Sequence, residues 1–264
     1  MSGLGLILSG GGARGAYEVG ALEYIFNEFG DDGGRPPSVD LISGTSVGAV
    51  NGAFVASMLH DLPGGIRSLV SVWSDLELAH VLGFGLRQAA GLYRVLLGGS
   101  AEARGVFDPS RLSILVGKNV NWRGLRQNIR TGQLKALTVS TTHVGTGQPV
   151  IFVDSAPGVT IPRSLGLHAL VRRAKIGQHH VLASAAIPLI FPAVEIGDEI
   201  HCYGGLRLNT PMGPSIHLWM NRLLVIGLST PQVEGRRAVQ DGKYPGATFM
   251  LGKVLNAFLL DHVN

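Results

Sequence analysis

Two short apolar runs near the N-terminus each end in a glycine-rich turn and then continue into a helical pattern. Residues 4–9 (LGLILS) lead into GGGARG, and residues 39–43 (VDLIS) lead into GTSVG. A short apolar run bounded by glycines is typical of a buried parallel strand, because both of its faces are covered. Strand, tight turn and helix in repeated succession predict an α/β fold, with a largely parallel sheet between helices.

The composition is that of a well-packed protein. The chain has 264 residues, of which 45% are hydrophobic and 15% charged, so we expect a sizeable core in one domain over residues 1–264. The net charge of +4 falls far short of a nucleic-acid footprint, and no nucleic-acid partner is expected. The lone cysteine, Cys202, excludes an intrachain disulfide, and we expect it to be a buried small hydrophobe.

Nothing in the sequence predicts insertion into a membrane. No uninterrupted apolar run reaches the length of about 18 residues that a transmembrane helix needs, and the N-terminus lacks the basic region of a signal peptide. We therefore expect a cytoplasmic protein that could touch a membrane surface peripherally. Arg163, Arg172, Arg173 and Lys175 could meet anionic headgroups, although a solvated helix face explains them equally well.

The remaining elements are less regular. FDPSRL predicts a helix start with Asp108 as N-cap and Pro109 at the first helical position. The glycine-rich segment 83–105 is a lipid-facing lid, an ordinary core segment or a loop. The apolar helical pattern of residues 246–264 ends without a polar cap, so we expect the domain to continue past residue 264. Residues 136–144 and 149–154 predict two strands with a tight connection across Gly145-Thr146-Gly147, and residues 222–228 predict a further buried strand.

GGGARG has two possible uses as a ligand loop. Gly10, Gly12 and Gly15 satisfy the dinucleotide-binding spacing, but the next strand ends in Ser43 rather than in an acidic residue, and Asp40 lies near its beginning. A P-loop is excluded because no Lys-Ser/Thr pair follows the glycines. The other use is as an anion trap, in which backbone N–H groups at a helix N-terminus hold a developing oxyanion. A turn that binds no ligand is the remaining alternative.

GTSVG supplies the nucleophile that such an anion trap requires. Gly44, Ser46 and Gly48 match G-x-S-x-G between a strand and a helix, the context in which a nucleophile elbow presents its serine. A serine hydroxyl is a weak nucleophile until a base takes its proton. The remaining question is which residue could be the base for Ser46.

At this point the sequence resembles the patatin-like phospholipases. The blocks that carry the resemblance are GGGARG, GTSVGA, ASAAIPLIFPAV and GGLRLNTP, which occur in this order between about residue 4 and residue 230. The resemblance implies a three-layer α/β/α fold and hydrolysis of lipid acyl esters by a Ser–Asp dyad, without a cofactor. It also implies that Ser46 is the nucleophile and that Gly10, Gly11, Gly12 and Arg14 form the oxyanion loop.

The family's catalytic aspartate is missing from its expected place. That place reads HCYGGLRLNTP, in which Gly204, Gly205, Asn209 and Pro211 match the pattern and Tyr203 stands where the aspartate is expected. Tyr203 could act as a base only as a phenolate, which requires its pKa to fall by some three units from about 10.

Neighbouring side chains offer one local substitute for the aspartate. If residues 192–203 form one strand, Asp198 points to the other face and Glu199 lies about 13 Å from Tyr203 along the strand. His201 shares the face with Tyr203 at about 6.6 Å and titrates in the range of a general base. The alternative is a histidine that a backbone group satisfies. The sequence therefore predicts a nucleophile and an oxyanion loop without an assured base.

Two functional hypotheses follow from these residues. The first is a lipid acyl hydrolase that acts through Ser46, and the second is a lipid-binding protein that has lost turnover because of Tyr203. A nucleotide-dependent enzyme is a distant third. His179 and His180 lack the spaced partners of a metal site, so we expect surface or capping roles for them and no metal.

Overall fold

The computed structural model describes residues 3–29, 37–76, 108–162, 169–188, 190–218 and 220–228. Within these residues an eight-stranded sheet has the order β5-β4-β3-β2-β1-β8, with β7 beside the end of β3 and β6 beside β7. The strands are β1 (Leu4–Leu8), β2 (Leu41–Thr45), β3 (Ala136–His143), β4 (Pro149–Ser155), β5 (Leu170–Arg173), β6 (Val194–Ile196), β7 (Glu199–Tyr203) and β8 (Arg222–Ile226).

The centre of the sheet is parallel, as the sequence predicted. Strands β8, β1, β2 and β3 lie side by side in this order and are parallel to one another, whereas β4 and β7 pair with β3 in the antiparallel sense. Strand β2 pairs with residues 136–140 of β3, and β7 pairs with residues 141–143. The end of β7 therefore lies beside β3 just beyond the point where β2 ends.

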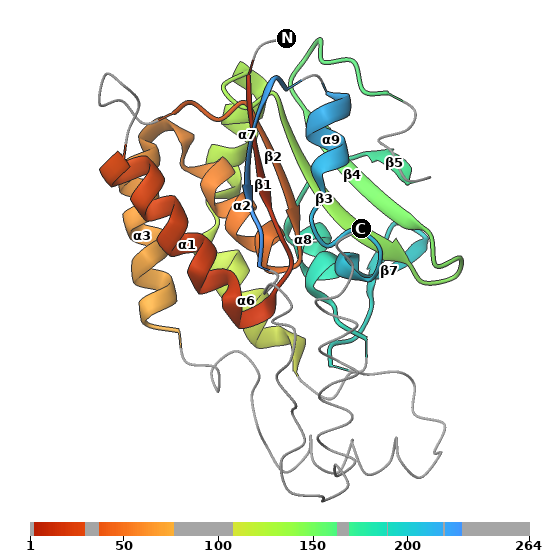
Figure 1. Cartoon of the computed structure of the whole chain (residues 1–264). Coiled ribbons are helices and arrows are strands. Elements are labelled where there is room, and N and C mark those ends of the chain that lie inside the picture. Colours follow the sequence, from red (N-terminus) through yellow and green to blue (C-terminus); the bar gives the residue numbers. More distant parts are fainter. Residues whose placement is uncertain are drawn as a thin grey trace, which may run out of the picture.

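Helices cover both faces of the sheet. Figure 1 shows α1, α2 and α3 on one side of the central strands and α9 on the other. The α-helices are α1 (Gly15–Glu23), α2 (Val47–Ser57), α3 (Leu62–Ser74), α6 (Pro109–Asn119), α7 (Trp122–Thr131), α8 (Gln178–Ala185) and α9 (Met212–His217). The shorter turns are η1 (Gly12–Arg14), η2 (Tyr24–Phe29), η3 (Leu59–Asp61) and η4 (Gly204–Leu206).

Two cores lie on opposite faces of the sheet. Ile42 of β2 belongs to the larger core beneath α1, α2 and α8, while its neighbour Leu41 belongs to a smaller core that includes Leu218 just after α9. Successive strand residues point to opposite faces, so a strand that is apolar at every position requires cover on both. The fold is thus a three-layer α/β/α architecture, as expected.

Local sequence chemistry sets the helix starts that the structure shows. Asp108 accepts a hydrogen bond from the N–H of Ser110 at the start of α6, which confirms the predicted cap, and Asp61 and Asn121 cap α3 and α7 in the same way. Such caps satisfy N–H groups that have no partner within the helix. Cys202 is buried, also as predicted.

Two strand predictions require correction. Residues 192–203 do not form one strand: Gly197, with a φ of 67°, turns the chain between β6 and β7, and the two strands pair as a hairpin. Strand β8 was predicted to be buried, but it is the last strand in the sheet order, and its side chains Leu223 and Val225 are 38% and 41% exposed.

Some predictions fall on other parts of the chain. Segments 83–105 and 246–264 and the side chain of Arg163 lie outside the described residues. Within the residues that are described, no helix combines the length and the apolar character that crossing a bilayer requires.

Candidate active site

Ser46 lies at a sharp turn between β2 and α2. Its φ of 55° and ψ of −122° make it the one non-glycine residue with a positive φ in the described part of the chain. Such a conformation is strained for an L-residue and persists only where the surrounding structure enforces it. The turn has the strand–turn–helix context of a nucleophile elbow, and Ser46 is 3% exposed.

The glycines of GTSVG allow the elbow to pack closely against the end of β1. A Cβ atom on Gly48 would lie 2.3 Å from the carbonyl oxygen of Leu8, the last residue of β1. Gly44 lies in β2 and packs against the first turn of α2 in a similar way. The motif is therefore needed for the packing of backbone on backbone at this point.

A second serine, Ser184, anchors the elbow. Its hydroxyl accepts a hydrogen bond from the N–H of Ser46 at 2.8 Å and donates to the carbonyl of Ser140 at 2.6 Å. All three residues are buried. Ser184 thereby ties the elbow to β3. The sequence analysis did not single it out, although it lies in the ASAAIP block that contributed to the family resemblance.

The glycine loop lies directly beside Ser46. A Cβ atom on Gly10 would lie 3.4 Å from the Cβ of Ser46, and the loop continues through Gly11 into the turn η1. The N–H of Gly10 donates to the carbonyl of Asn209 at 2.9 Å. Among the described residues, no hydrogen bond is found for the N–H of Gly11 or Gly12.

The other predicted loop residue, Arg14, faces a different partner. Its Nη1 donates to the carbonyl of Leu228 at 3.1 Å, and its side chain is exposed. Asn209 holds the loop from the opposite side, because its Nδ2 donates to the carbonyl of Gly10 at 3.3 Å. Asn209 thus fixes both the N–H and the C=O of Gly10.

Tyr203 is in contact with Ser46. In the register of the sheet, Thr45 lies opposite Ser140 and Tyr203 lies opposite Thr141, so the ends of β2 and β7 meet beside β3. Burial raises the pKa of Tyr203 to about 12, and a hydrogen bond between its phenol and Ser46 acts in the opposite direction on that pKa. The phenol is therefore neutral at pH 7 and does not become the phenolate that a base would have to be.

The ring of Tyr203 also fills the space around the loop. A Cβ on Gly10 would lie 3.0 Å from the phenol oxygen, and the side chain is 1% exposed. Gly204 and Gly205 follow in η4, where Gly205 packs against the tyrosine ring. The position at which the family resemblance implies a carboxylate is thus filled by a buried aromatic ring.

His201 lies on the same strand as Tyr203 but is engaged elsewhere. Its Nδ1 lies 3.1 Å from the hydroxyl of Thr141, its Nε2 lies 3.5 Å from Glu199 Oε2, and its ring packs edge-on against Phe152. Burial lowers the pKa of His201, which the Glu199 carboxylate partly opposes. Within the described part of the chain, no hydrogen bond joins His201 to Ser46.

A buried carboxyl group joins α1 to α2. Glu18 of α1 is 0% exposed, and its Oε2 accepts a hydrogen bond from Asn51 Nδ2 of α2 at 2.9 Å. Asn51 in turn accepts from Trp73 Nε1 at 2.9 Å. Burial raises the pKa of Glu18 to about 8, while hydrogen bonds from Asn51 and from the backbone of Ser9 lower it. Sequence reasoning missed this group, since it treated α1 only as an apolar pattern.

An apolar cavity of about 280 Å³ lies next to the residues that anchor the elbow. Its wall includes Ala185 and Ala186, which follow Ser184, and the carbonyl of Ala186 accepts the N–H of Tyr203 at 2.9 Å. The rest of the lining comes from α6, α8 and the chain before β6: Pro109, Ser110, Leu112, Ser113, Leu182, Phe191, Pro192 and Val194.

Of the histidine pair, His180 has the capping role, one of the two roles that the sequence predicted. His180 is buried at the start of α8, where its Nδ1 accepts the N–H of Gly177 at 3.1 Å, and burial lowers the pKa of His180 to about 3. In the described part of the chain, no group of three or more His, Cys, Asp or Glu side chains could hold a metal ion.

The fold and this geometry define a class of protein: an α/β protein that presents a strained serine beside a glycine loop at the carboxyl ends of parallel strands. The sequence profile of the patatin-like phospholipase family matches residues 6–216. The chain therefore belongs to the patatin-like phospholipase family.

Individual relatives match over limited lengths. A stretch of 53 residues is 45% identical to part of the lysophospholipase nte1 of Aspergillus terreus. This stretch makes up 20% of this chain and 3% of that protein. Among solved structures, VipD from Legionella pneumophila has a TM-score of 0.43 at 16% identity, over 77% of this chain and 46% of that one. ExoU of Pseudomonas aeruginosa, in complex with SpcU, has a TM-score of 0.32 at 17% identity, over 72% and 39%. This chain thus spans less than half the length of each of these proteins.

Proposed function

We propose that this protein is a lipid acyl hydrolase in which Ser46 attacks the ester carbonyl and the glycine loop holds the oxyanion. The observation that carries the proposal is the strained turn at Ser46, which lies beside Gly10 of the glycine loop. Backbone donors that are fixed before the reaction stabilise a developing oxyanion without reorganising. Gly10 supports the loop through Asn209, so Gly11 and Gly12 are the donors in this mechanism.

The substrate class follows from the surroundings of the serine. An apolar cavity adjoins the anchor of the elbow, and a cavity with that lining accommodates a hydrocarbon chain rather than a polar acyl group. The reaction is ordinary acyl transfer: Ser46 Oγ forms a bond to the carbonyl carbon, the alcohol leaves with a proton, and water then releases the acid. Membership of a phospholipase family supports lipid esters as the substrates.

A second candidate is a lipid-binding protein with little or no turnover. Tyr203 favours it, because its neutral phenol contacts Ser46 at the position where the family resemblance implies an aspartate. With His201 engaged by Thr141, the described residues provide no carboxylate or imidazole in hydrogen-bond contact with Ser46. In this candidate the fold and the apolar cavity keep a binding role while proton transfer is lost.

The test is a burst assay with a short p-nitrophenyl ester, followed by mass spectrometry of the protein. Continuous release of nitrophenol with transient acylation of Ser46 supports the hydrolase. A single burst with stable acylation, or no reaction together with binding of a fluorescent fatty acid, supports the second candidate. Ser46→Ala should abolish acylation, whereas Ser57→Ala, which removes another buried hydroxyl from α2, should not. Activity that persists in Ser46→Ala would overturn both.

A further inference from the structure

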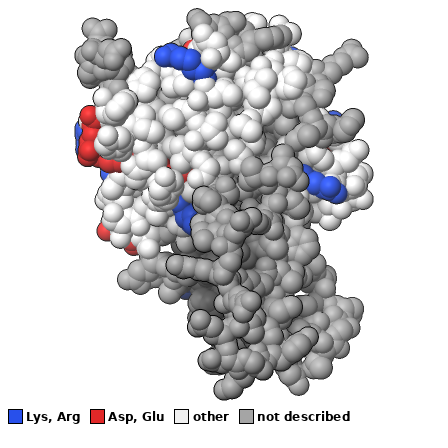
Figure 2. Space-filling model, viewed as in Figure 1, with Lys and Arg blue, Asp and Glu red and all other residues white. Residues whose placement is uncertain are grey.

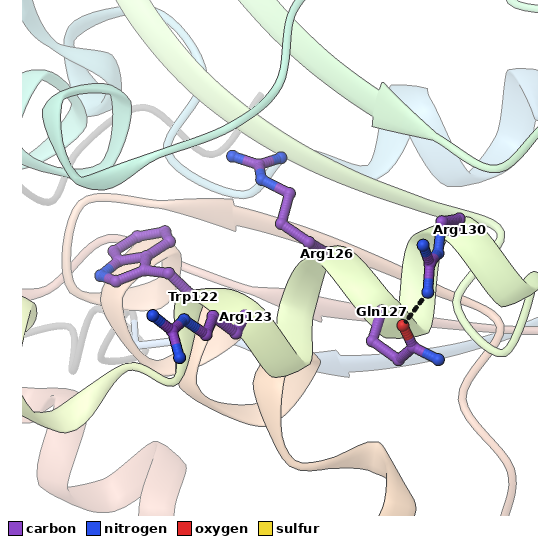
Figure 3. A pocket seen from close by; sticks show the side chains of 5 residues that line it. All are labelled: Trp122, Arg123, Arg126, Gln127 and Arg130. Atoms are coloured by element: carbon purple, nitrogen blue, oxygen red, sulfur yellow. Dashed lines mark hydrogen bonds between the residues drawn. The ribbon is translucent and has the colours of Figure 1, made fainter.

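The outer face of α7 carries three arginines and no acidic residue. Arg123, Arg126 and Arg130 project from successive turns together with Gln127, and Trp122 lies at the start of the helix (Figure 3). Like charges three or four residues apart destabilise an isolated helix, and surface helices usually intersperse acids to relieve this. A helix that breaks this local rule without such relief is a place to look for function.

The positive charge on this face is only partly compensated. Arg126 forms an ion pair with Asp154 and also donates to the carbonyl of Ile176, and Lys175 acts electrostatically on the same Asp154. Arg130 donates to the neutral side chain of Gln127. Arg123 has no partner among the described residues. Among the described residues, Asp154 is therefore the one carboxylate that an ion pair joins to α7.

The arginines border an open, shallow cavity on the surface of α7. It measures about 380 Å³, and the five residues that line it all belong to this helix: Trp122, Arg123, Arg126, Gln127 and Arg130. On the face shown in Figure 2, by contrast, the visible Lys and Arg side chains lie apart from one another. Arg126 is also fixed in place by its contacts with Asp154 and Ile176, so part of the site is ordered before any ligand arrives.

We propose that this cavity binds a ligand bearing two or more phosphate groups. The guanidinium group is planar and donates two parallel hydrogen bonds to phosphate oxygens, which is why arginine prevails at phosphate sites. Arg123 and Arg130 are seven residues apart, or about 10 Å along a helix, so they suit a ligand whose negative charges are spread over more than one phosphate. Closely spaced phosphate groups occur in soluble diphosphates and on the surfaces of membranes that contain phosphorylated lipids.

The test compares two double variants that remove the same charge. Arg123→Gln/Arg130→Gln empties the cavity of its two freer cations and leaves Arg126 to hold Asp154. Arg67→Gln/Arg111→Gln removes two exposed arginines from α3 and α6 and is the matched control. Binding of pyrophosphate is measured by calorimetry. Binding to phosphatidylcholine vesicles, with and without phosphatidic acid, is measured by sedimentation.

The α7 variant should bind at least about 10-fold more weakly than wild type, because each charge-assisted hydrogen bond is lost outright, while the control should stay within about twofold. Calorimetric binding of pyrophosphate alone identifies a soluble diphosphate as the ligand class. Sedimentation with phosphatidic acid alone identifies a lipid surface. The proposal is overturned if wild type binds neither probe, or if both double variants weaken binding equally, since net charge alone would then explain the result.

Discussion

The two halves of the candidate site differ in what they are made of. On one side, the elbow and the glycine loop are built from backbone: a positive φ at Ser46 and glycines that admit close approach. On the other side, the proposed position of the base holds one side chain, that of Tyr203. The first half has the geometry on which the proposed acyl transfer depends, whereas the second holds a neutral phenol.

The comparison shows which of the two halves is also needed for the packing of the sheet. The elbow glycines pack against β1 and α2, and Ser184 anchors the turn to β3, so changing them disturbs the packing of the sheet. The side chain of Tyr203 fills space at the end of β7, where Tyr203 lies opposite Thr141 of β3. The serine turn is therefore tied to the packing of the sheet through several backbone contacts, whereas position 203 depends on the side chain of one buried residue.

The largest expected effect is a gain of activity from Tyr203→Asp. Losing the base from a serine hydrolase costs about 10⁶ in kcat, so a carboxylate beside Ser46 should raise kcat/KM by about 10⁴-fold even if its geometry is imperfect. The ordinary pKa of an aspartate, about 3.9, favours the carboxylate at neutral pH, and its smaller side chain would free the space that the phenol fills beside Gly10. The measurement is kcat/KM on one p-nitrophenyl ester for wild type and variant.

Tyr203→Phe is the matched control for this prediction, because it removes the hydroxyl and keeps the ring. It should give no comparable gain. If wild type is already fast and the aspartate adds nothing, the base lies elsewhere. If His201→Ala alone abolishes the activity, the histidine is the base in spite of its contact with Thr141.

The next prediction concerns Glu18, the buried carboxyl group that joins α1 to α2. Glu18→Gln should remove a pH-dependent cost of folding, because burial raises the pKa of Glu18 from 4.5 to about 8. Between these pH values the unfolded chain loses this proton and the folded chain keeps it, so stability falls as pH rises. At 1.36 kcal/mol per unit, the cost reaches up to about 5 kcal/mol above pH 8.

The measurement is the free energy of unfolding by urea at about pH 5 and about pH 9. Wild type should lose more stability between these values than Glu18→Gln, and Glu28→Gln, at an exposed position near the end of the same helical segment, should behave as wild type. Parallel changes in all three proteins would mean that Glu18 does not titrate in this range.

The glycine loop gives a third test, in which the loop is altered and the serine is left in place. A side chain on Gly11 would meet Leu228 at 2.5 Å, so Gly11→Val should displace the loop and its N–H groups. Removing one oxyanion donor costs on the order of 10² to 10³ in rate, and a loss of that size is expected in the Tyr203→Asp protein. Gly20→Val, where a Cβ meets open space, controls for the substitution itself. Normal turnover by the Gly11 variant would exclude the loop as the oxyanion hole.

The sequence predicted the backbone half of the site well, for a physical reason. Glycines beside a serine between an apolar run and a helical pattern are local signals, and the parallel strands β1 and β2, the helix start at Asp108 and the tight β3–β4 connection were all found in this way. Each depends on turn chemistry or periodicity within a few residues. The family resemblance implied the same three-layer arrangement.

What the sequence did not predict depends on contacts between distant segments. Residues 192–203 were considered as one strand, but Gly197 turns the chain into a hairpin. The sequence alone does not distinguish a glycine that adopts a positive φ from one inside a strand. The bonds of Ser184 to Ser46 and Ser140, and that of Glu18 to Asn51, join residues far apart in the chain. The contact of Tyr203 with Ser46 likewise appears only once β7 is placed beside β3.

The last prediction concerns Ser184, which ties the turn at Ser46 to β3. Ser184→Ala leaves two buried backbone groups unpaired, the N–H of Ser46 and the carbonyl of Ser140, and each such group costs about 1–3 kcal/mol of stability. The loss should appear as a lower urea midpoint with an unchanged slope. Ser57→Ala is the control, since the hydroxyl of Ser57 donates only to the carbonyl of Phe54 within its own helix and its loss should cost less. Equal losses in the two variants would mean that Ser184 contributes no more than an ordinary buried hydroxyl, and the strain at Ser46 would then have to be held by the packing of Gly44 and Gly48 alone.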